Sequence, residues 1–368
     1  MRNNTPAISV ILTTHNCENH AKRVINSILN QTFEDIELII IDDHSTDATL
    51  AICHSLQTTN SSKRIFLHKN EQNSGAAFSR NVGLQKAQGE YVIFLDDDDF
   101  YSPLMLELAY KKAITHKADI VVVGSQSYDT QSELTHILDN IKVRPEILRS
   151  VFSYRDIKEN FFESFTWWAW DKLIRRTMII DNKLTFQQIR SSNDLSFTCK
   201  AFFNAERICI EPQVLVTHII NRHNSLSSSR KLSYACVIYA LNNLFQYMNE
   251  NSIYSSLKND FCYYCVNFIF WHQSTIQAPE DRLLCIEALN FFKDTMITLD
   301  ALPDGEIKQK YLAICIKAGE AEIVKLMETM SKDIAQPHSV ARTQASSFVS
   351  MLQALLIFIR RNNGHSAG

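Results

Sequence analysis

Residues 91–103 read YVIFLDDDDFYSP, in which five apolar residues run directly into four consecutive aspartates. A continuous apolar run of this length, with β-branched and aromatic residues, is typical of a strand buried on both faces of a parallel sheet. Neighbouring carboxylates repel one another, and the stretch contains no Lys or Arg that would neutralise them. The pattern therefore predicts a buried strand that ends in an acidic loop, where a positive charge comes from outside the stretch.

Similar apolar runs lie on both sides of this strand and alternate with segments of helical spacing. The further strand candidates are 7–14 (AISVILTT), 36–42 (IELIIID), 64–68 (RIFLH) and 119–123 (DIVVV). The helix candidates are 21–29, 47–56 and 74–87, and Ser45 and Asp47 are suitable N-capping residues for the second of them. This alternation predicts a doubly wound, mainly parallel, Rossmann-like α/β sheet over residues 1–124.

The remainder of the chain changes character twice. Residues 125–230 are less regular, and we interpret them as the second half of one domain that spans 1–230. Residues 231–335 predict a helical appendage, and 336–368 a tail with one amphipathic helix, 347–361 (SFVSMLQALLIFIRR). That helix is too short to span a bilayer, but it could lie in a membrane interface, bind a partner or pack on its own domain.

Composition limits the classes of protein that the chain could be. Its 368 residues carry a net charge of -3, so no basic field favours nucleic acid as a partner. The nine cysteines have no paired spacing apart from Cys262 and Cys265, which we interpret as buried thiols of a helix. The opening MRNNTPAISV lacks the apolar core of a signal peptide, and we expect a reduced, cytoplasmic protein.

Polar and acidic residues follow three of the predicted strands. They are Thr13 to Asn16, Asp42 and Asp43, and Asp96 to Asp99. Open parallel sheets bind ligands beyond the carboxyl ends of their strands, so these groups are expected to converge on one edge. Mg²⁺ and Mn²⁺ prefer oxygen ligands and often share carboxylates with substrate phosphates. We therefore predict Mn²⁺ or Mg²⁺ and a bound diphosphate, against the alternative of a solvated acidic turn.

The ordered motifs resemble those of glycosyltransferase family 2. They are ISVILTTHN, IIIDDHSTDAT, NSGAAFSRNVGLQKAQGEYVIFLDDDD and WDKLIRR. The resemblance is dense over residues 7–124, patchy to about 228 and absent beyond. It implies the GT-A fold, with a nucleotide-binding half at 1–124 and an acceptor half at 125–230, and inverting transfer of a sugar from a nucleotide donor.

The resemblance also implies a nucleotide site. Thr13 and Asn16 match the family motif at the end of the first strand, where His15 replaces an aromatic residue that packs near the base. Asp43 matches the carboxylate that accepts a hydrogen bond from the uracil imide, which favours a UDP-sugar donor.

The diphosphate and metal ligands are implied in the same way. Arg80, in SRNVG, matches the family's basic residue near the donor diphosphate. Asp98 matches the direct metal ligand, and Asp96 or Asp97 holds the ribose or a metal-bound water, so that the metal set is Asp98 with Asp96. A fourth aspartate, Asp99, blurs this register by one position.

Inverting transfer needs a general base that removes a proton from the acceptor hydroxyl. The family's Glu-Asp pair corresponds here to Asn193 and Asp194, which makes Asp194 the predicted base. Asn193 keeps a hydrogen-bonding side chain but lacks the usual charge, so acceptor recognition could differ. Asp194 could also act as a helix N-cap, and the two roles are compatible.

The segment TWWAWDKLIRR corresponds to a part of the family that lines the sugar pocket. Its three tryptophans cannot share one helical face; we favour Trp170 for the pocket, with Trp168 second and core packing of the set as the alternative. In HIINRHNSLS, His218, Arg222 and His223 match basic positions that could close over the diphosphate, or form an ordinary basic loop.

The leading hypothesis is a metal-dependent, inverting hexosyltransferase that moves a sugar from a UDP-sugar to a saccharide or glycolipid acceptor. The resemblance implies a role in surface polysaccharide, capsule or lipooligosaccharide biosynthesis, as a peripheral protein at the cytoplasmic face of the inner membrane. Single transfer is the simpler prediction, since one acidic motif and no membrane channel are encoded. The alternatives are a catalytically inactive scaffold and, less favoured because TTHNCENH is not a Gly-rich basic loop, a sugar-nucleotide pyrophosphorylase.

Overall fold

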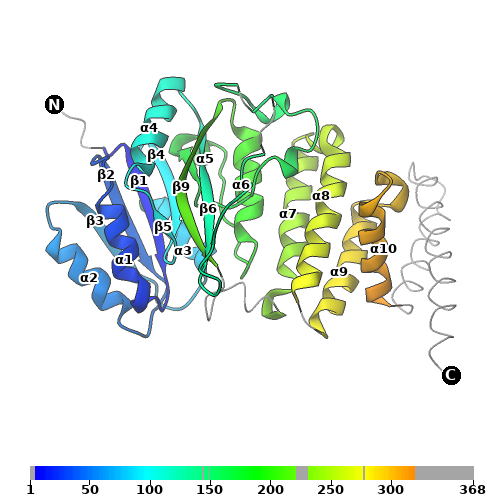
Figure 1. Cartoon of the computed structure of the whole chain (residues 1–368), viewed down its shortest axis with the longest axis horizontal. Helices are drawn as coiled ribbons and strands as arrows, with labels where there is room; N and C mark the ends of the chain where they lie inside the picture. Colours follow the sequence, from blue (N-terminus) through cyan, green and yellow to red (C-terminus); the bar gives the residue numbers. More distant parts are fainter. Residues whose placement is uncertain (1–4, 143–144, 148, 221–230, 277, 320–368) are drawn as a thin grey trace. The chain divides into compact units, whose positions relative to one another are not determined.

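The computed structural model of the chain describes residues 5–142, 145–147, 149–220, 231–276 and 278–319 (Figure 1). The chain divides into two compact units, Met1–Ser228 and Ser229–Gly368. The boundary expected at residue 230 lies close to this division. The predicted tail, 336–368, with its amphipathic helix at 347–361, lies outside the described residues.

A mixed sheet of nine strands forms the centre of the first unit. Its strand order is β3-β2-β1-β4-β8-β6-β9-β5, and β7 pairs with β6 outside this path. The strands are β1 (Ile8–Thr14), β2 (Ile36–Asp42), β3 (Arg64–Lys69), β4 (Tyr91–Asp96), β5 (Phe100–Tyr101), β6 (Ile120–Asp129), β7 (Thr135–Ile137), β8 (Lys172–Arg175) and β9 (Ile208–Ile220).

The half of the sheet formed by β3, β2, β1 and β4 is parallel, as its apolar runs predict. All seven residues of β1 are buried, because helices cover both faces of a sheet that is built from strand–helix–strand units. The helices of this unit are α1 (Glu18–Leu29), α2 (Thr49–Thr59), α3 (Ala76–Lys86), α4 (Met105–His116), α5 (Arg176–Asp181) and α6 (Asn193–Asn204).

Two local features of this half position the later site. Helix α3 packs closely on β1, and a Cβ at Gly83 would collide with Ile11. The N-cap of α2 is Ala48 rather than the predicted Ser45 or Asp47, although Asp47 accepts a hydrogen bond from the Thr49 amide at 2.9 Å just before the helix. Ser45, the other predicted cap, instead donates to Asp42 at 2.5 Å and fixes the end of β2.

The other half of the sheet departs from the parallel pattern. Strand β8 is antiparallel to both β4 and β6, and β9 runs parallel to β6. Strand β6 is longer than the apolar run at 119–123, because it continues through an irregularity at Gly124. A Cβ at Gly124 would lie 2.6 Å from the Pro212 carbonyl oxygen, so glycine allows β9 to pass close to β6.

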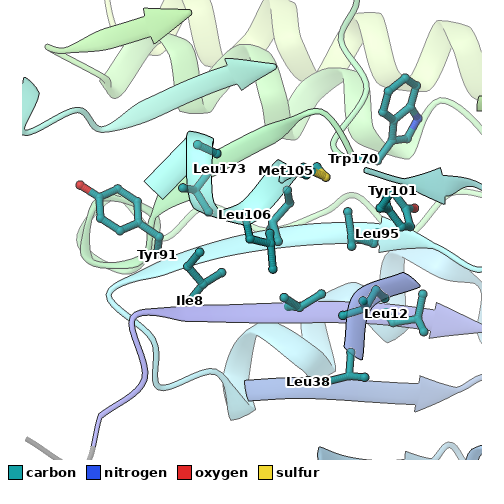
Figure 2. Packing of buried hydrophobic residues seen from close by; sticks show 14 of the residues in the cluster. Ile8, Leu12, Leu38, Tyr91, Leu95, Tyr101, Met105, Leu106, Trp170 and Leu173 are labelled. Carbon is teal, nitrogen blue, oxygen red and sulfur yellow. The ribbon is translucent and has the colours of Figure 1, made fainter. Parts of the chain in front are cut away.

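The core of the first unit lies against the sheet, and Figure 2 shows part of it. Ile8, Leu12 and Leu38 from the parallel strands pack with Met105 and Leu106 of α4. Trp170, which precedes β8, belongs to the same buried cluster and is 3% exposed. This burial bears on the predicted sugar pocket, as described below.

The second unit is helical in its described part. It contains α7 (Cys236–Glu250), α8 (Tyr254–Thr275), α9 (Glu280–Asp294) and α10 (Glu306–Ala318). Cys262 and Cys265 lie buried on α8, as expected for thiols of a helix, and all nine cysteines of the chain are free and buried. None of the described helices combines the length and apolar character needed to cross a membrane.

Candidate functional site

The parallel strands bring the predicted polar residues to one edge of the sheet. Thr13 of β1 is in register with Asp96 of β4, and Thr14 with Asp42 of β2. Three segments that are distant in sequence therefore end side by side, where an open α/β sheet binds its ligands.

Asp43 is held by the loop that follows β3. Its Oδ1 accepts from Asn70 Nδ2 at 2.8 Å and from the Ser74 amide at 2.9 Å, and its Oδ2 accepts from the Gly75 amide at 2.7 Å. Gly75 has φ +86°, a conformation that favours glycine. Because a carboxylate offers about four acceptor positions, Asp43 keeps one for a ligand beyond the three that fix its loop.

His15 sits beside Asp43 with both ring nitrogens engaged. Its Nδ1 lies 2.8 Å from the Asp43 carbonyl oxygen and must carry the proton of that bond. Its Nε2 then accepts from Asn73 Nδ2 at 3.0 Å and from Asn16 Nδ2 at 3.2 Å. The imidazole is fixed in one tautomer, and its ring faces are the surfaces left for contact with a base.

The acidic loop after β4 is fixed by its neighbours. The His15 amide donates to Asp97 Oδ2 at 2.9 Å. The buried Tyr101 hydroxyl donates to the Asp96 carbonyl and accepts from the Asp96 amide, both at 2.9 Å. Asp97 thus joins the acidic loop to the end of β1, beside the predicted nucleotide site.

Part of the positive charge expected from outside the acidic stretch comes from the protein itself. Arg80 NH2 lies 2.6 Å from Asp96 Oδ1, and Arg80 is 6% exposed. Arg23 of α1 donates to the Asp98 carbonyl at 2.8 Å. Arg80 lies 16 positions from Asp96 and was predicted to bind the diphosphate rather than this carboxylate, whereas Arg23 is 75 positions from Asp98 and the local pattern did not reveal it.

Three carboxylates of this loop form a group that could hold a metal ion. Ligand oxygens of Asp96, Asp98 and Asp99 lie within 4.8 Å of one another. Asp99 is fully buried, and its Oδ2 has no hydrogen-bond donor among the described residues. A buried acceptor of this kind is costly unless something satisfies it, so the oxygen-rich set fits a hard divalent cation such as Mg²⁺ or Mn²⁺.

Asp99 and His218 are site residues whose connection the sequence did not reveal. Asp99 Oδ1 accepts from His218 Nδ1 at 2.8 Å and from the Ile219 amide at 3.1 Å. Burial raises the pKa of Asp99, and the bond from His218 opposes that shift. The only signal in the sequence was the fourth aspartate, because the contact depends on the pairing of β5 with β9.

Arg80 connects the acidic loop to the residue that precedes the predicted base. Arg80 NH1 donates to Asn193 Oδ1 at 2.7 Å, while its NH2 binds Asp96. Asp194 follows on the first turn of α6. Burial raises the pKa of Asp194; the charge of Arg80 opposes this shift and Asp96 adds to it. Both terminal nitrogens of Arg80, which we expected near the donor diphosphate, are therefore engaged by protein.

The tryptophans divide between core and site. Trp167 packs among Phe161, Phe165 and Phe202. Trp170, which we favoured for the sugar pocket, is buried in the core of the sheet (Figure 2).

Trp168 is the partly exposed indole of the set and the better candidate for a sugar contact. It stacks on Trp170 at 4.9 Å between ring centroids and lies 5.8 Å from the ring of His218. Arg222 and His223 lie outside the described residues.

The fold and this edge together define a GT-A domain. Residues 9–181 match the profile of Glycosyl transferase family 2, so this region of the chain is similar to that family.

Curated relatives agree with this assignment. The chain is 28% identical over 317 residues to the cholesterol galactosyltransferase of Borreliella burgdorferi, which covers 78% of this chain and 85% of that protein. It is 30% identical over 208 residues to the uncharacterized glycosyltransferase EpsJ of Bacillus subtilis, covering 55% of this chain and 58% of EpsJ. The chain thus spans less than two thirds of the second relative.

Solved structures support the fold. The crystal structure of residues 1–349 of TarS from Staphylococcus aureus covers 96% of this chain and 91% of that chain, with a TM-score of 0.58 and 19% identity. The same TarS fragment in complex with UDP-GlcNAc gives a TM-score of 0.54.

Proposed function

We propose that the protein is a metal-dependent, inverting glycosyltransferase that transfers a hexose or N-acetylhexosamine from a UDP-sugar to a saccharide or glycolipid acceptor. One observation carries this proposal. The carboxylates of Asp96, Asp98 and Asp99 lie within 4.8 Å of one another at the ligand-binding edge of the sheet, and Arg80 connects Asp96 to the turn that bears Asp194.

Asp98 and Asp96, with Asp99, would hold Mn²⁺ or Mg²⁺ in this proposal. Such an ion stabilises the negative charge that develops on a departing diphosphate. The buried Oδ2 of Asp99 supports its inclusion, since no described residue donates a hydrogen bond to it.

The nucleotide would occupy the rim beside Asp43 and His15. The remaining acceptor position of Asp43 suits the imide N–H of uracil, whereas N3 of cytosine has no proton to donate. A ring face of His15 and the hydroxyl-bearing end of β1 at Thr13 would complete the base pocket, with Asp97 or Asp96 near the ribose. Trp168, rather than the buried Trp170, would contact the apolar face of the sugar.

Asp194 would act as the general base. Burial raises the pKa of Asp194 towards neutral pH. A more basic carboxylate accepts a proton from an acceptor hydroxyl more readily. Inversion requires that hydroxyl to attack from the side opposite the diphosphate. In this proposal Asp194 approaches from the start of α6, next to Asn193, while the metal and the diphosphate lie at the acidic loop.

The proposed acceptor and cellular location are supported by the relatives alone. One relative is named for galactosyl transfer to cholesterol, and TarS for transfer of N-acetylglucosamine to poly(ribitol phosphate). Acceptors of both kinds belong to cell-envelope chemistry, and we propose such an acceptor, with a cytoplasmic, membrane-peripheral enzyme that adds a single residue. A ladder of products with excess donor would contradict single transfer.

A panel of UDP-sugars with and without Mn²⁺ tests the proposed function. The true donor should raise the thermal midpoint in the presence of metal, because ligand at 100 times its Kd adds about 2.7 kcal/mol of stability. The same donor should release UDP. No shift with any uridine nucleotide, with or without metal, would overturn the proposal.

A further inference from the structure

Arg80 occupies a position that its expected contact with the donor diphosphate does not explain. Its guanidinium is nearly buried, and its two terminal nitrogens donate to different elements, Asp96 at the end of β4 and Asn193 at the start of α6. The guanidinium carbon also lies 5.3 Å from the ring centroid of Phe186. Arg80 is therefore committed to protein on three sides.

The residue that follows Arg80 strengthens the same connection. Asn81 Nδ2 donates to the Phe186 carbonyl at 2.8 Å, and Asn81 Oδ1 accepts from the Phe186 amide at 2.9 Å. Phe186 in turn stacks on Phe197 of α6 at 3.9 Å between centroids. Two successive residues of α3 thus hold both the segment that leads into α6 and its first turn.

The turn before α6 needs such support. Ser192 has φ +55°, a left-handed conformation that is uncommon for a residue with a side chain. It immediately precedes Asn193, which is 5% exposed and accepts the Arg80 bond, and Asp194 comes next. The bond from Arg80 to Asn193 therefore holds the start of α6, and with it the backbone that carries Asp194.

We infer that Arg80 is a positioning residue that holds the base-bearing turn of α6 at a fixed place relative to the acidic loop, through the amide of Asn193. This inference rests on the proposed function and deepens it. Asn193 suits the role because its amide is neutral. It accepts a hydrogen bond from Arg80 without neutralising the guanidinium charge, which therefore continues to act on Asp96 and Asp194. Loss of the Asn193 bond alone would displace the base, while the bond between Arg80 and Asp96 at the donor site remains.

The test compares variants at position 193 in the full chain, with Mn²⁺ and the UDP-sugar that the wild-type protein uses. Asn193→Leu removes the acceptor, and we expect kcat to fall about 10- to 100-fold, as for small misplacements of reacting groups. The Kd for UDP should change by less than about 2-fold, because binding of the nucleotide does not need the base. Asn193→Asp restores an acceptor oxygen and should recover most of kcat.

Arg80→Lys distinguishes positioning from diphosphate binding. A lysine can keep the ion pair with Asp96 but cannot also donate to Asn193 in the fork geometry of arginine, so kcat should fall while the ratio of UDP to UMP affinity stays constant. The double variant Arg80→Lys/Asn193→Leu should be no slower than the slower single variant, since both break one bridge. Gln188→Leu, an exposed amide in the same segment, is the matched control and should retain wild-type kcat.

The results distinguish a failure of the proposed function from a failure of the inference about Arg80. A wild-type protein that neither binds UDP nor releases it from any sugar donor overturns the proposed function. A wild-type enzyme whose Asn193→Leu variant keeps its kcat, or whose Arg80→Lys variant loses affinity for UDP but not for UMP, overturns the inference alone. The thermal midpoint of each variant verifies that it folds. If the leucine side chain prevents folding of Asn193→Leu, Asn193→Ala is used instead.

Discussion

Asp99 Oδ1 accepts a hydrogen bond from His218 Nδ1 at 2.8 Å, although the two residues are 119 positions apart in the chain. The same oxygen accepts from the Ile219 amide, so one buried carboxylate anchors β9 to the acidic loop. Its other oxygen, Oδ2, accepts no hydrogen bond from the described residues, and a carboxylate oxygen of Asp99 lies within 4.8 Å of those of Asp96 and Asp98. One aspartate therefore serves both the sheet and the candidate metal group.

Asp99→Ala should lower the free energy of unfolding by about 1–3 kcal/mol, because the partly buried Ile219 amide loses its acceptor. Urea unfolding measures this change. Asp35→Ala is a suitable control, since Asp35 is a half-exposed partner of Arg64 and such surface pairs contribute about 0–1 kcal/mol. Equal losses in the two variants would contradict the anchoring role.

Asp98→Asn should reduce metal-stimulated UDP release by about 100-fold or more, because an amide is a neutral and weaker ligand for a hard cation. The variant should still fold, since the Asp98 carbonyl that binds Arg23 is unchanged. A titration of activity with Mn²⁺ checks the result. Unchanged metal dependence would remove Asp98 from the metal set.

Asp194→Asn should reduce sugar transfer by about 10²- to 10⁴-fold, the usual contribution of a general base. Its affinity for UDP should remain close to that of the wild type, because the base acts on the acceptor. Isothermal titration with UDP and an assay of UDP release give the two quantities. Loss of both would indicate a structural role at the start of α6.

The pH dependence follows from the pKa of Asp194, which burial raises above its usual value. The base must be ionised, so kcat/KM should be high above this raised pKa and fall as the pH decreases through it. This fall of kcat/KM at low pH should be absent from the residual activity of Asp194→Asn. If the same fall of kcat/KM persists in the variant, it is caused by the titration of another group.

Trp168→Ala and Trp170→Ala should differ in what they impair. Removal of Trp170 from the core should cost about 3–5 kcal/mol of stability. Trp168 is partly exposed, so its loss should cost less stability and should raise the KM for the sugar donor. Denaturant unfolding and donor kinetics on the same samples distinguish the two effects. If Trp170→Ala instead raises the KM for the donor and Trp168→Ala costs more stability, Trp170 lines the sugar pocket.

Several parts of the site could be predicted from the sequence because their signals are local. The apolar run of β4 and the aspartates after it are adjacent in the chain, so the acidic edge is visible without coordinates. The contacts of Arg80 with Asn193 and of Asp99 with His218 join residues that are 113 and 119 positions apart. No periodicity encodes such pairs, since they depend on which elements pack together.

The sequence by itself determined the parallel half of the sheet, the helices between its strands, the acidic end of β4 and the position of Asp194 before an apolar helical stretch. Hydrophobic periodicity and turn residues specify these features within a few residues of where they occur. Only the tertiary structure decided that β8 runs antiparallel, that Trp170 is core while Trp168 is partly exposed, and that Arg80 bridges Asp96 and Asn193. These outcomes depend on the packing of distant segments, because burial and partnership are properties of the assembled fold.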